Sequence, residues 1–232
     1  MRTPPEQHAP PVQRLRVQYA KRGRARFTSS RDFSRAFERA LRRAGVPMAY
    51  SSGFSPHPRI SYANAAPTGA ASEAEFCEIG LAATCDPELV REALDAALPP
   101  GLDVVRVVPA DPGALADRLT GSRWRIALTG VSAETLDRSV AAFLATTEVL
   151  VERMTKNGIR TFDARGAVVS LVAVGPTELE LVSRHLVPLV RPDDVLSALS
   201  TLTPDFRPAD APVLTRVAQG QMSDDGAIAD PL

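Results

Sequence analysis

Residues that could carry chemistry gather between positions 26 and 62, where arginines, aromatic side chains and a histidine lie close together. In the first part of this stretch arginines recur every three or four residues, a spacing that brings side chains to one face of a helix. They are Arg31, Arg35, Arg39, Arg42 and Arg43, and Arg59 follows farther on. A guanidinium group donates a fork of hydrogen bonds that fits phosphate oxygens. The chemistry that this row predicts is phosphate binding.

The charge of the 232-residue chain is unevenly distributed. Residues 14–59 hold twelve basic side chains and two acidic ones, a net charge of +10, and eleven of the twelve are arginines. The whole chain is neutral, so residues 60–232 carry a net charge of −10. Such a separation is unfavourable unless an anionic partner uses the basic part. The alternative explanation of the arginine row is a solvated helix face.

The stretch after the arginines joins a stiff backbone to flat side chains. Gly53 allows backbone angles that other residues avoid, and Pro56 and Pro58 hold His57 extended from both sides. The flat side chains are Tyr50, Phe54 and Tyr62, on which an RNA base could stack. An alternative is a rigid surface turn whose Phe54 fills the core. His57 as a general base is a weaker possibility, because no nucleophile or carboxylate accompanies it at a telling spacing.

The arginine row requires a helix, and the local sequence predicts one over residues 29–44. Ser29 and Asp32 have the spacing of a capping box. Apolar residues then recur at intervals of three and four, as on the buried face of a helix. Gly45 and Pro47 mark its end. On the outer face, Glu38 is expected to pair with Arg42 one turn later.

The order of predicted elements indicates an α+β protein built of two tandem ferredoxin-like (βαββαβ) units, with antiparallel sheets and helices on one face. The predicted divisions are a disordered lead-in (1–12), a first domain with the basic helix and the GFSPHP loop (13–109), a connector (110–121), a second domain (122–220) and a disordered tail (221–232). The second domain has an extra hairpin with a turn at Asn157-Gly158.

Other features narrow the possible functions. Cys77 and Cys85 are too few for a disulfide framework and indicate a reducing cytoplasm. Their spacing fits neither a zinc site nor an iron–sulfur cluster, so we expect no metal and no cofactor. No apolar run is long enough to span a membrane. Three acidic residues, Glu73, Glu75 and Glu78, are interpreted as a solvated edge, and Asp163 with Arg165 as a structural ion pair. His8 and His185 suggest no chemistry.

The runs FERALRRAGVPMAYSSGFSPHPRISYA and APTGAASEAEFCEIGLA resemble a bacterial family of radical-SAM-associated (radical-SAM-linked) proteins that contains a domain of unknown function. The resemblance implies an accessory partner of a radical SAM protein rather than a self-sufficient enzyme. It also leads us to expect a histidine just before the helix, where this chain has Ser30.

Three functions remain open. The first is a non-catalytic accessory protein that binds RNA and works with a radical SAM enzyme, in modification or processing of tRNA or rRNA. Its RNA-binding residues would be Arg31, Arg35, Arg39, Arg42, Arg43, Tyr50, Phe54, His57 and Arg59. The second is a metal-independent endoribonuclease of Cas6-like fold, with His57 and Arg59 as catalytic residues. The third is a protein-only adaptor that docks its basic helix on the partner enzyme.

Overall fold

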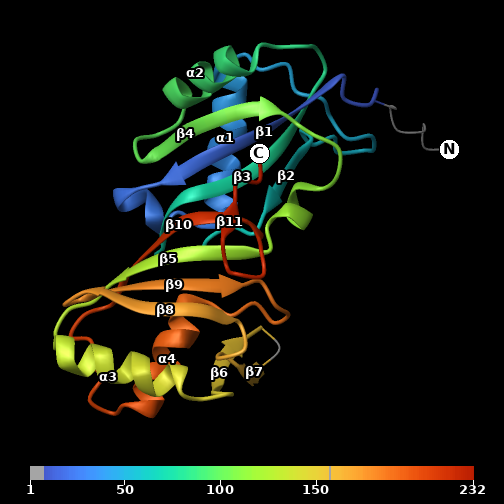
Figure 1. Ribbon diagram of the computed structural model, residues 1–232. Coiled ribbons are helices and arrows are strands. Elements are labelled where there is room, and N and C mark those ends of the chain that lie inside the picture. Colours follow the sequence, from blue (N-terminus) through green and yellow to red (C-terminus); the bar gives the residue numbers. More distant parts are fainter. Residues whose placement is uncertain (1–7, 157) are drawn as a thin grey trace. The chain divides into compact units, whose positions relative to one another are not determined.

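The protein has a mixed α+β fold, in which the described residues form four α-helices and mostly antiparallel sheets (Figure 1). The structure is a computed structural model that describes residues 8–156 and 158–232. The chain divides into two compact units, with the boundary between Asp117 and Arg118. Among the described residues, no helix combines the length and the apolar character needed to cross a membrane.

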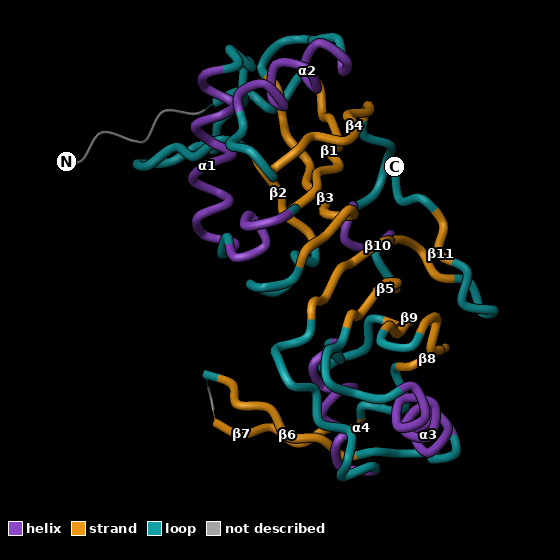
Figure 2. The backbone as a smooth tube through the Cα atoms, turned by 90° about the vertical axis from the view of Figure 1, so that its left-hand side faces the viewer, coloured by secondary structure: helices purple, strands orange, loops and turns teal. Residues whose placement is uncertain are grey.

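The first unit contains four strands and two α-helices. In chain order they are β1 (Gln13–Lys21), the 3-10 helix η1 (Gly23–Phe27), α1 (Ser30–Arg43), β2 (Ile60–Ala63), β3 (Ala71–Leu81), α2 (Pro87–Ala97) and β4 (Leu102–Pro109). The strands lie in the order β4-β1-β3, with β2 on the other side of β3, and every neighbouring pair is antiparallel. Figure 2 shows α1 running beside these strands.

The core of the first unit forms between one face of its sheet and both helices. Alternate residues of β1, among them Val17 and Tyr19, are buried on this face. Phe33 and Phe37 of α1 pack against them, and the rings of Tyr19 and Phe33 stack with centroids 4.2 Å apart. Leu94 of α2 belongs to the same cluster. Burial of these side chains, each favourable by about 1.5–3 kcal/mol, fixes which face of α1 remains in solvent.

The second unit contains the remaining elements. They are η2 (Leu115–Arg118) at the boundary, β5 (Gly121–Ala127), α3 (Ala133–Leu144), β6 (Leu150–Thr155), β7 (Gly158–Asp163), β8 (Val168–Gly175), β9 (Glu178–Arg184), α4 (Pro192–Leu202), β10 (Val213–Met222) and β11 (Ile228–Ala229). The strand order is β10-β5-β9-β8. Strands β6 and β7 form a separate antiparallel hairpin (Figure 2). Of its predicted turn, Asn157 lies outside the described residues.

Both ends of the chain differ from the sequence prediction. Residues 1–7 of the predicted lead-in lie outside the described residues, but residues 8–12 pack on the first unit. The Val12 N–H donates to the Leu81 carbonyl at 2.8 Å, and the N–H of His8 donates to Ser52 Oγ at 3.0 Å. In the predicted tail, β11 pairs with the end of β10. Composition did not reveal that these two segments are structured, because the hydrogen bonds that hold them come from distant parts of the chain.

Candidate nucleic-acid interface

The predicted basic helix is present as α1 and begins at the predicted cap. Ser29 has extended backbone angles, and its Oγ accepts a hydrogen bond from the N–H of Asp32 at 3.2 Å. Past the last turn, Gly45 has a φ of 67°, which glycine adopts without strain. Local signals therefore fix where the helix begins and ends, and the packing of its apolar residues fixes which side chains it exposes.

One exposed face of α1 carries four arginines, which we call the arginine face: Arg31, Arg35, Arg39 and Arg42. Among the described residues, none of the four makes an ion pair or a hydrogen bond through its side chain. The expected pair between Glu38 and Arg42 is not formed, and Glu38 instead lies 3.5 Å from the hydroxyl of Ser34. Neighbours four residues apart on a helix are separated by about 6 Å along its axis. The arginine face is thus a regular row of charges open to solvent.

Arg43 differs from these four arginines. Its Nη2 donates to the carbonyl oxygen of Ala97, the last residue of α2. A carbonyl at a helix C-terminus has no partner within the helix and carries partial negative charge, so it favours a guanidinium group. Arg43 therefore ties α1 to α2 and is engaged within the protein.

Other arginines of the basic segment are neutralised inside the first unit. Arg22 pairs with Glu73 and with Asp103. The hydrogen bond to Glu73 raises the pKa of Arg22, and this effect exceeds that of burial, which alone would lower the pKa. Arg14 and Arg16 both pair with Glu78, and Arg16 has no exposed surface. The net charge of residues 14–59 thus overstates what a partner could use. Of the eight arginines in this segment that have no carboxylate partner among the described residues, four are on the arginine face.

The same ion pairs correct the interpretation of the three glutamates. Glu73 and Glu78 are salt-bridge partners of the arginines named above, and the side chain of Glu78 is 13% exposed. Glu75 is buried and accepts a hydrogen bond from the N–H of Ala66 at 2.9 Å. These residues are not a solvated edge. The partners of Glu78 on β1 are more than sixty residues away, and Arg22 is 51 residues from Glu73, so no local pattern could identify these ion pairs.

The loop between α1 and β2 is closed by its own backbone. The Ser51 N–H donates to the His57 carbonyl at 2.9 Å, and the His57 N–H donates to Ser51 Oγ at 3.0 Å. A bridge between Tyr50 and Pro58 flanks this pair. At the tip, Gly53 has a φ of 130°. The loop is therefore stiff at its base, as the prolines predict.

The aromatic side chains of this region divide into two groups. Phe54 is 73% exposed and does not fill the core, and Tyr50 is 37% exposed. Tyr62 instead packs edge-on against Phe33 and Phe37, and burial raises the pKa of its hydroxyl. Tyr62 is 39% exposed, but its ring is engaged with α1 by these edge contacts, so Phe54 and Tyr50 are the rings best placed to accept a stacked base.

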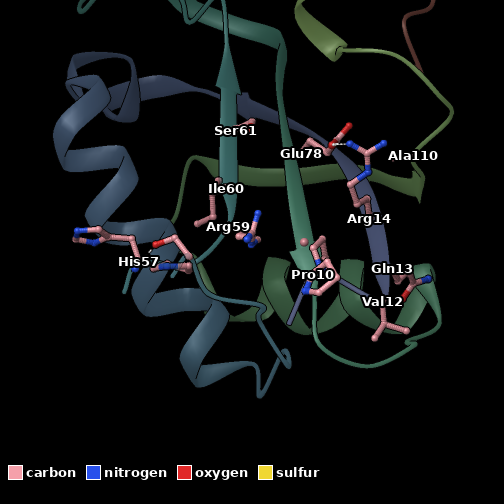
Figure 3. A pocket seen from close by; sticks show the side chains of 14 residues that line it. Pro10, Val12, Gln13, Arg14, His57, Arg59, Ile60, Ser61, Glu78 and Ala110 are labelled. Carbon is pink, nitrogen blue, oxygen red and sulfur yellow. Dashed lines mark hydrogen bonds and ion pairs between the residues drawn. The ribbon is translucent and has the colours of Figure 1, made fainter. Parts of the chain in front are cut away.

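The side chains of His57 and Arg59 are directed to different places. Figure 3 shows the His57 ring pointing away from the Arg59 guanidinium. Within the described part of the chain, no hydrogen bond involves the His57 ring, so nothing orients it as an acid or base. Arg59 Nε donates to the carbonyl of Tyr50 at 3.2 Å. The geometry gives His57 a position beside the arginine face rather than a reaction partner.

Two cavities meet at His57. A cavity of about 210 Å³ lies between α1 and the loop, and Arg42, Tyr50 and His57 line it. A second cavity, of about 770 Å³, lies beyond the loop and is lined by His57 and Arg59 together with residues of β1, β2 and β3 (Figure 3). His57 therefore stands between the arginine face and the larger cavity. Sequence reasoning missed the larger cavity.

One residue of the lead-in also belongs to this surface. His8 lies beside the loop, with its ring centroid 6.4 Å from that of Tyr50. Gly80 of β3 makes room for the lead-in, because a Cβ there would lie 3.1 Å from Pro11 and 3.3 Å from Arg59. An isolated glycine within a strand often marks a place where another segment comes close. Gly80 was therefore the one feature of the sequence that could have indicated the packing of the lead-in on β3.

The remaining candidate residues are structural. Burial would raise the pKa of Asp163, but the backbone N–H groups of Val149, Arg165 and Gly166 donate to its carboxylate and lower the pKa overall. Asp163 thus organises the bend after β7 through backbone hydrogen bonds, rather than through the expected ion pair with Arg165.

His185 is also structural. Its Nδ1 lies 2.7 Å from the carbonyl oxygen of Leu119, which can only accept, so Nδ1 carries the proton. Its Nε2 lies 2.8 Å from Ser122 Oγ and accepts from that hydroxyl. Burial lowers the pKa of His185, which keeps the ring neutral in this network.

Fold and surface together define an α+β protein whose basic helix stands beside a stiff loop with exposed rings. A family model described as an uncharacterized protein conserved in bacteria (DUF2344) matches residues 14–192, which include the basic helix, the loop, the smaller cavity and most of the residues that line the larger one. The chain belongs to this family. No curated protein is similar enough to the sequence to count as a match.

Proposed function

We propose that the protein binds RNA through the arginine face of α1 and the exposed rings of the adjoining loop. The observation that carries the proposal is the contrast within one basic segment. Arg14, Arg16 and Arg22 have carboxylate partners, whereas the four arginines of the arginine face have none among the described residues. Unpaired, regularly spaced guanidinium groups are suited to a chain of phosphates.

The exposed rings favour RNA with unpaired bases over a duplex. Phe54 and Tyr50 lie on the loop that follows α1, and Tyr50 and Arg42 line the same small cavity. Bases of an unpaired strand can stack on such rings while its phosphates contact arginines. In a duplex the bases are already stacked on one another and do not reach a protein ring. Phosphate contacts and stacking together would hold a single-stranded region.

The protein is proposed to be a non-catalytic accessory to a radical SAM enzyme that modifies or processes tRNA or rRNA. The resemblance of residues 37–63 and 66–82 to radical-SAM-associated proteins supports this partner. The lack of an oriented acid or base around His57 in the described structure favours binding over cleavage. The two thiols and the lack of a disulfide framework support action in the cytoplasm.

Both units are further proposed to be ferredoxin-like. In the first unit, the elements βαββαβ have the strand order β4-β1-β3-β2. In the second, β5, α3, β8, β9, α4 and β10 have the corresponding order β10-β5-β9-β8, with the β6–β7 hairpin inserted after α3. Sheets of this type commonly support RNA binding, although a fold alone does not fix a function.

Binding to labelled single-stranded RNA, measured by fluorescence anisotropy at low salt, tests the proposal. Phe54→Ala should weaken binding about tenfold, because one stacked base contributes about 1–3 kcal/mol. Met154→Ala removes an equally exposed apolar side chain in the second unit and should leave the affinity unchanged. Failure of the native protein to bind RNA would refute the proposal.

The protein-only adaptor is distinguished by purification with and without nuclease. If the protein binds RNA, nuclease treatment should remove nucleic acid that co-purifies with it. A radical SAM partner that stays bound after nuclease, and is lost on Arg35→Glu, would assign the arginine face to protein docking instead.

A further inference from the structure

The larger cavity beside the loop has walls from several parts of the first unit. It measures about 770 Å³ and is lined by residues of neighbouring strands, among them Ser61 of β2 and Glu78 and Gly80 of β3. Residues 10–14 form one wall, and the loop from His57 to Ile60 forms another (Figure 3). Its volume is within the range of about 300–1,000 Å³ that is usual for ligand sites.

Arg59 is held in this cavity by its own backbone. Its N–H donates to the Ala49 carbonyl at 2.8 Å, and its carbonyl accepts from the Gly80 N–H at 2.9 Å. Its Nε is directed to the Tyr50 carbonyl at 3.2 Å. The two terminal nitrogens have no acceptor among the described residues. Arg59 thus presents a positioned guanidinium edge that an anion can bind without much loss of side-chain entropy.

The charges around the cavity favour an anion. Glu78 is its one acidic lining residue among those described, and it accepts from Arg14 Nη1 at 3.1 Å and from Arg16 Nε at 3.4 Å. One carboxylate is thus shared by two guanidinium groups, and Arg59 is additional. The lining keeps a positive excess, which suits a group such as a phosphate diester.

The rest of the lining is neutral. Ser51 and Ser61 offer hydroxyl groups, and three prolines with Ile60 offer apolar surface. A nucleotide combines the features that this lining would recognise: an anionic phosphate, a polar sugar and a flat, partly apolar base. A free anion such as phosphate would leave most of the volume unused.

We infer that this cavity binds one unpaired nucleotide of the bound RNA, with its phosphate on Arg59. The inference rests on the proposed RNA binding and names its substrate class: RNA with an unpaired end or bulge next to the segment on the arginine face. His57 lines both this cavity and the small cavity that contains Arg42. An RNA strand that follows the arginine face can therefore pass over Pro56, His57 and Pro58 and place its next base in the larger cavity.

The test compares two RNA hairpins that differ only in a three-nucleotide unpaired 3′ overhang. The native protein should bind the hairpin with the overhang about tenfold more tightly, the gain expected for one well-placed base. Ser61→Trp fills the cavity and should bring the ratio of the two affinities to about one. Arg59→Gln, which adds no bulk, should reduce the same ratio. Thr161→Trp, at an exposed strand position of β7 outside the cavity, should keep the native ratio.

Four results would overturn the inference. Equal affinities for the two hairpins in the native protein would do so while leaving the proposed RNA binding intact. An unchanged ratio in both Ser61→Trp and Arg59→Gln would assign the gain to another surface. Binding of adenosine, guanosine, cytidine or uridine monophosphate by calorimetry, without any gain from the overhang, would make this a site for a free nucleotide. Binding of neither hairpin would refute the proposed function as well.

Discussion

Removing two charges from the arginine face should lower both the RNA affinity and its dependence on salt. The double variant Arg35→Ala with Arg39→Ala deletes two of the four guanidinium groups that lack a partner in the described structure. Each phosphate neutralised on a single strand contributes about −0.7 to the slope of log K against log salt. If each arginine contacts one phosphate, the slope should change from about −2.8 to about −1.4.

This change in slope has a measurable size. Between about 50 mM and about 200 mM salt, the native protein should lose about 50-fold in affinity and the double variant only about sevenfold. The assay is a fluorescence anisotropy titration of a labelled single-stranded RNA at several salt concentrations. The fold should be unaffected, because neither arginine bonds to the protein and both arginine and alanine favour helix. The free energy of unfolding should therefore change by less than about 0.5 kcal/mol.

A matched control removes the same charge elsewhere. Arg160→Ala with Arg207→Ala deletes two exposed arginines of the second unit and should keep the native slope. The reasoning is refuted if the α1 double variant has the native slope. It is refuted equally if the control variant loses as much affinity as the α1 variant, since general electrostatic attraction would then explain the binding.

Three further predictions concern packing. Burial lowers the pKa of His185 below the unfolded value of about 6.5, so its contribution to stability is present above that pH and is lost as the pH falls toward the folded pKa. Denaturant melts from about pH 8 to about pH 5.5 should show this loss of stability. The His185→Gln variant should show a smaller loss over the same pH range. Both Gly101 and Gly113 have positive φ, but only at Gly101 would a Cβ meet other atoms, so Gly101→Ala should lower the free energy of unfolding by about 1 kcal/mol more than Gly113→Ala. Iodoacetamide should label Cys85 but not Cys77 in the native protein, because Cys77 is buried and burial raises its thiol pKa; mass spectrometry should find one adduct in buffer and two in urea.

Each of these has a contradicting result. A pH dependence that is the same in His185→Gln would show that the ring is not what titrates. Equal losses from the two glycine variants would mean that the close contacts at Gly101 relax without cost. Labelling of Cys77 as fast as Cys85 would show that its strand opens readily.

The basic helix was predictable because its signals are local. The cap at Ser29, the apolar spacing and the stop at Gly45 all lie within one short stretch, and α1 begins and ends there. The partners of its neighbours were not predictable, since Arg16 reaches Glu78 only through the register of β1 against β3. A charge count along the sequence therefore overestimated the free positive charge.

The orientation of the aromatic side chains was only partly predictable. The sequence left open whether Phe54 fills the core or stays in solvent, and the loop closure through Ser51 and His57 decides for solvent. The sequence did not show that the Tyr62 ring contacts Phe33 of α1, because this contact depends on the packing of β2 beside α1. The larger cavity depends on residues 10–14, which composition assigned partly to a disordered lead-in.

The paired hydrogen bonds between Ser51 and His57 also have a consequence for engineering the loop. They close the base of the loop, and residues 52–56 at its tip contribute no side chain to the core of the first unit. Substitutions at this tip should therefore cost little stability, except at Gly53, whose φ of 130° strains any other residue. Changes at Phe54 should act on binding rather than on folding, and grafting a different tip onto the same base offers a direct route to altered selectivity.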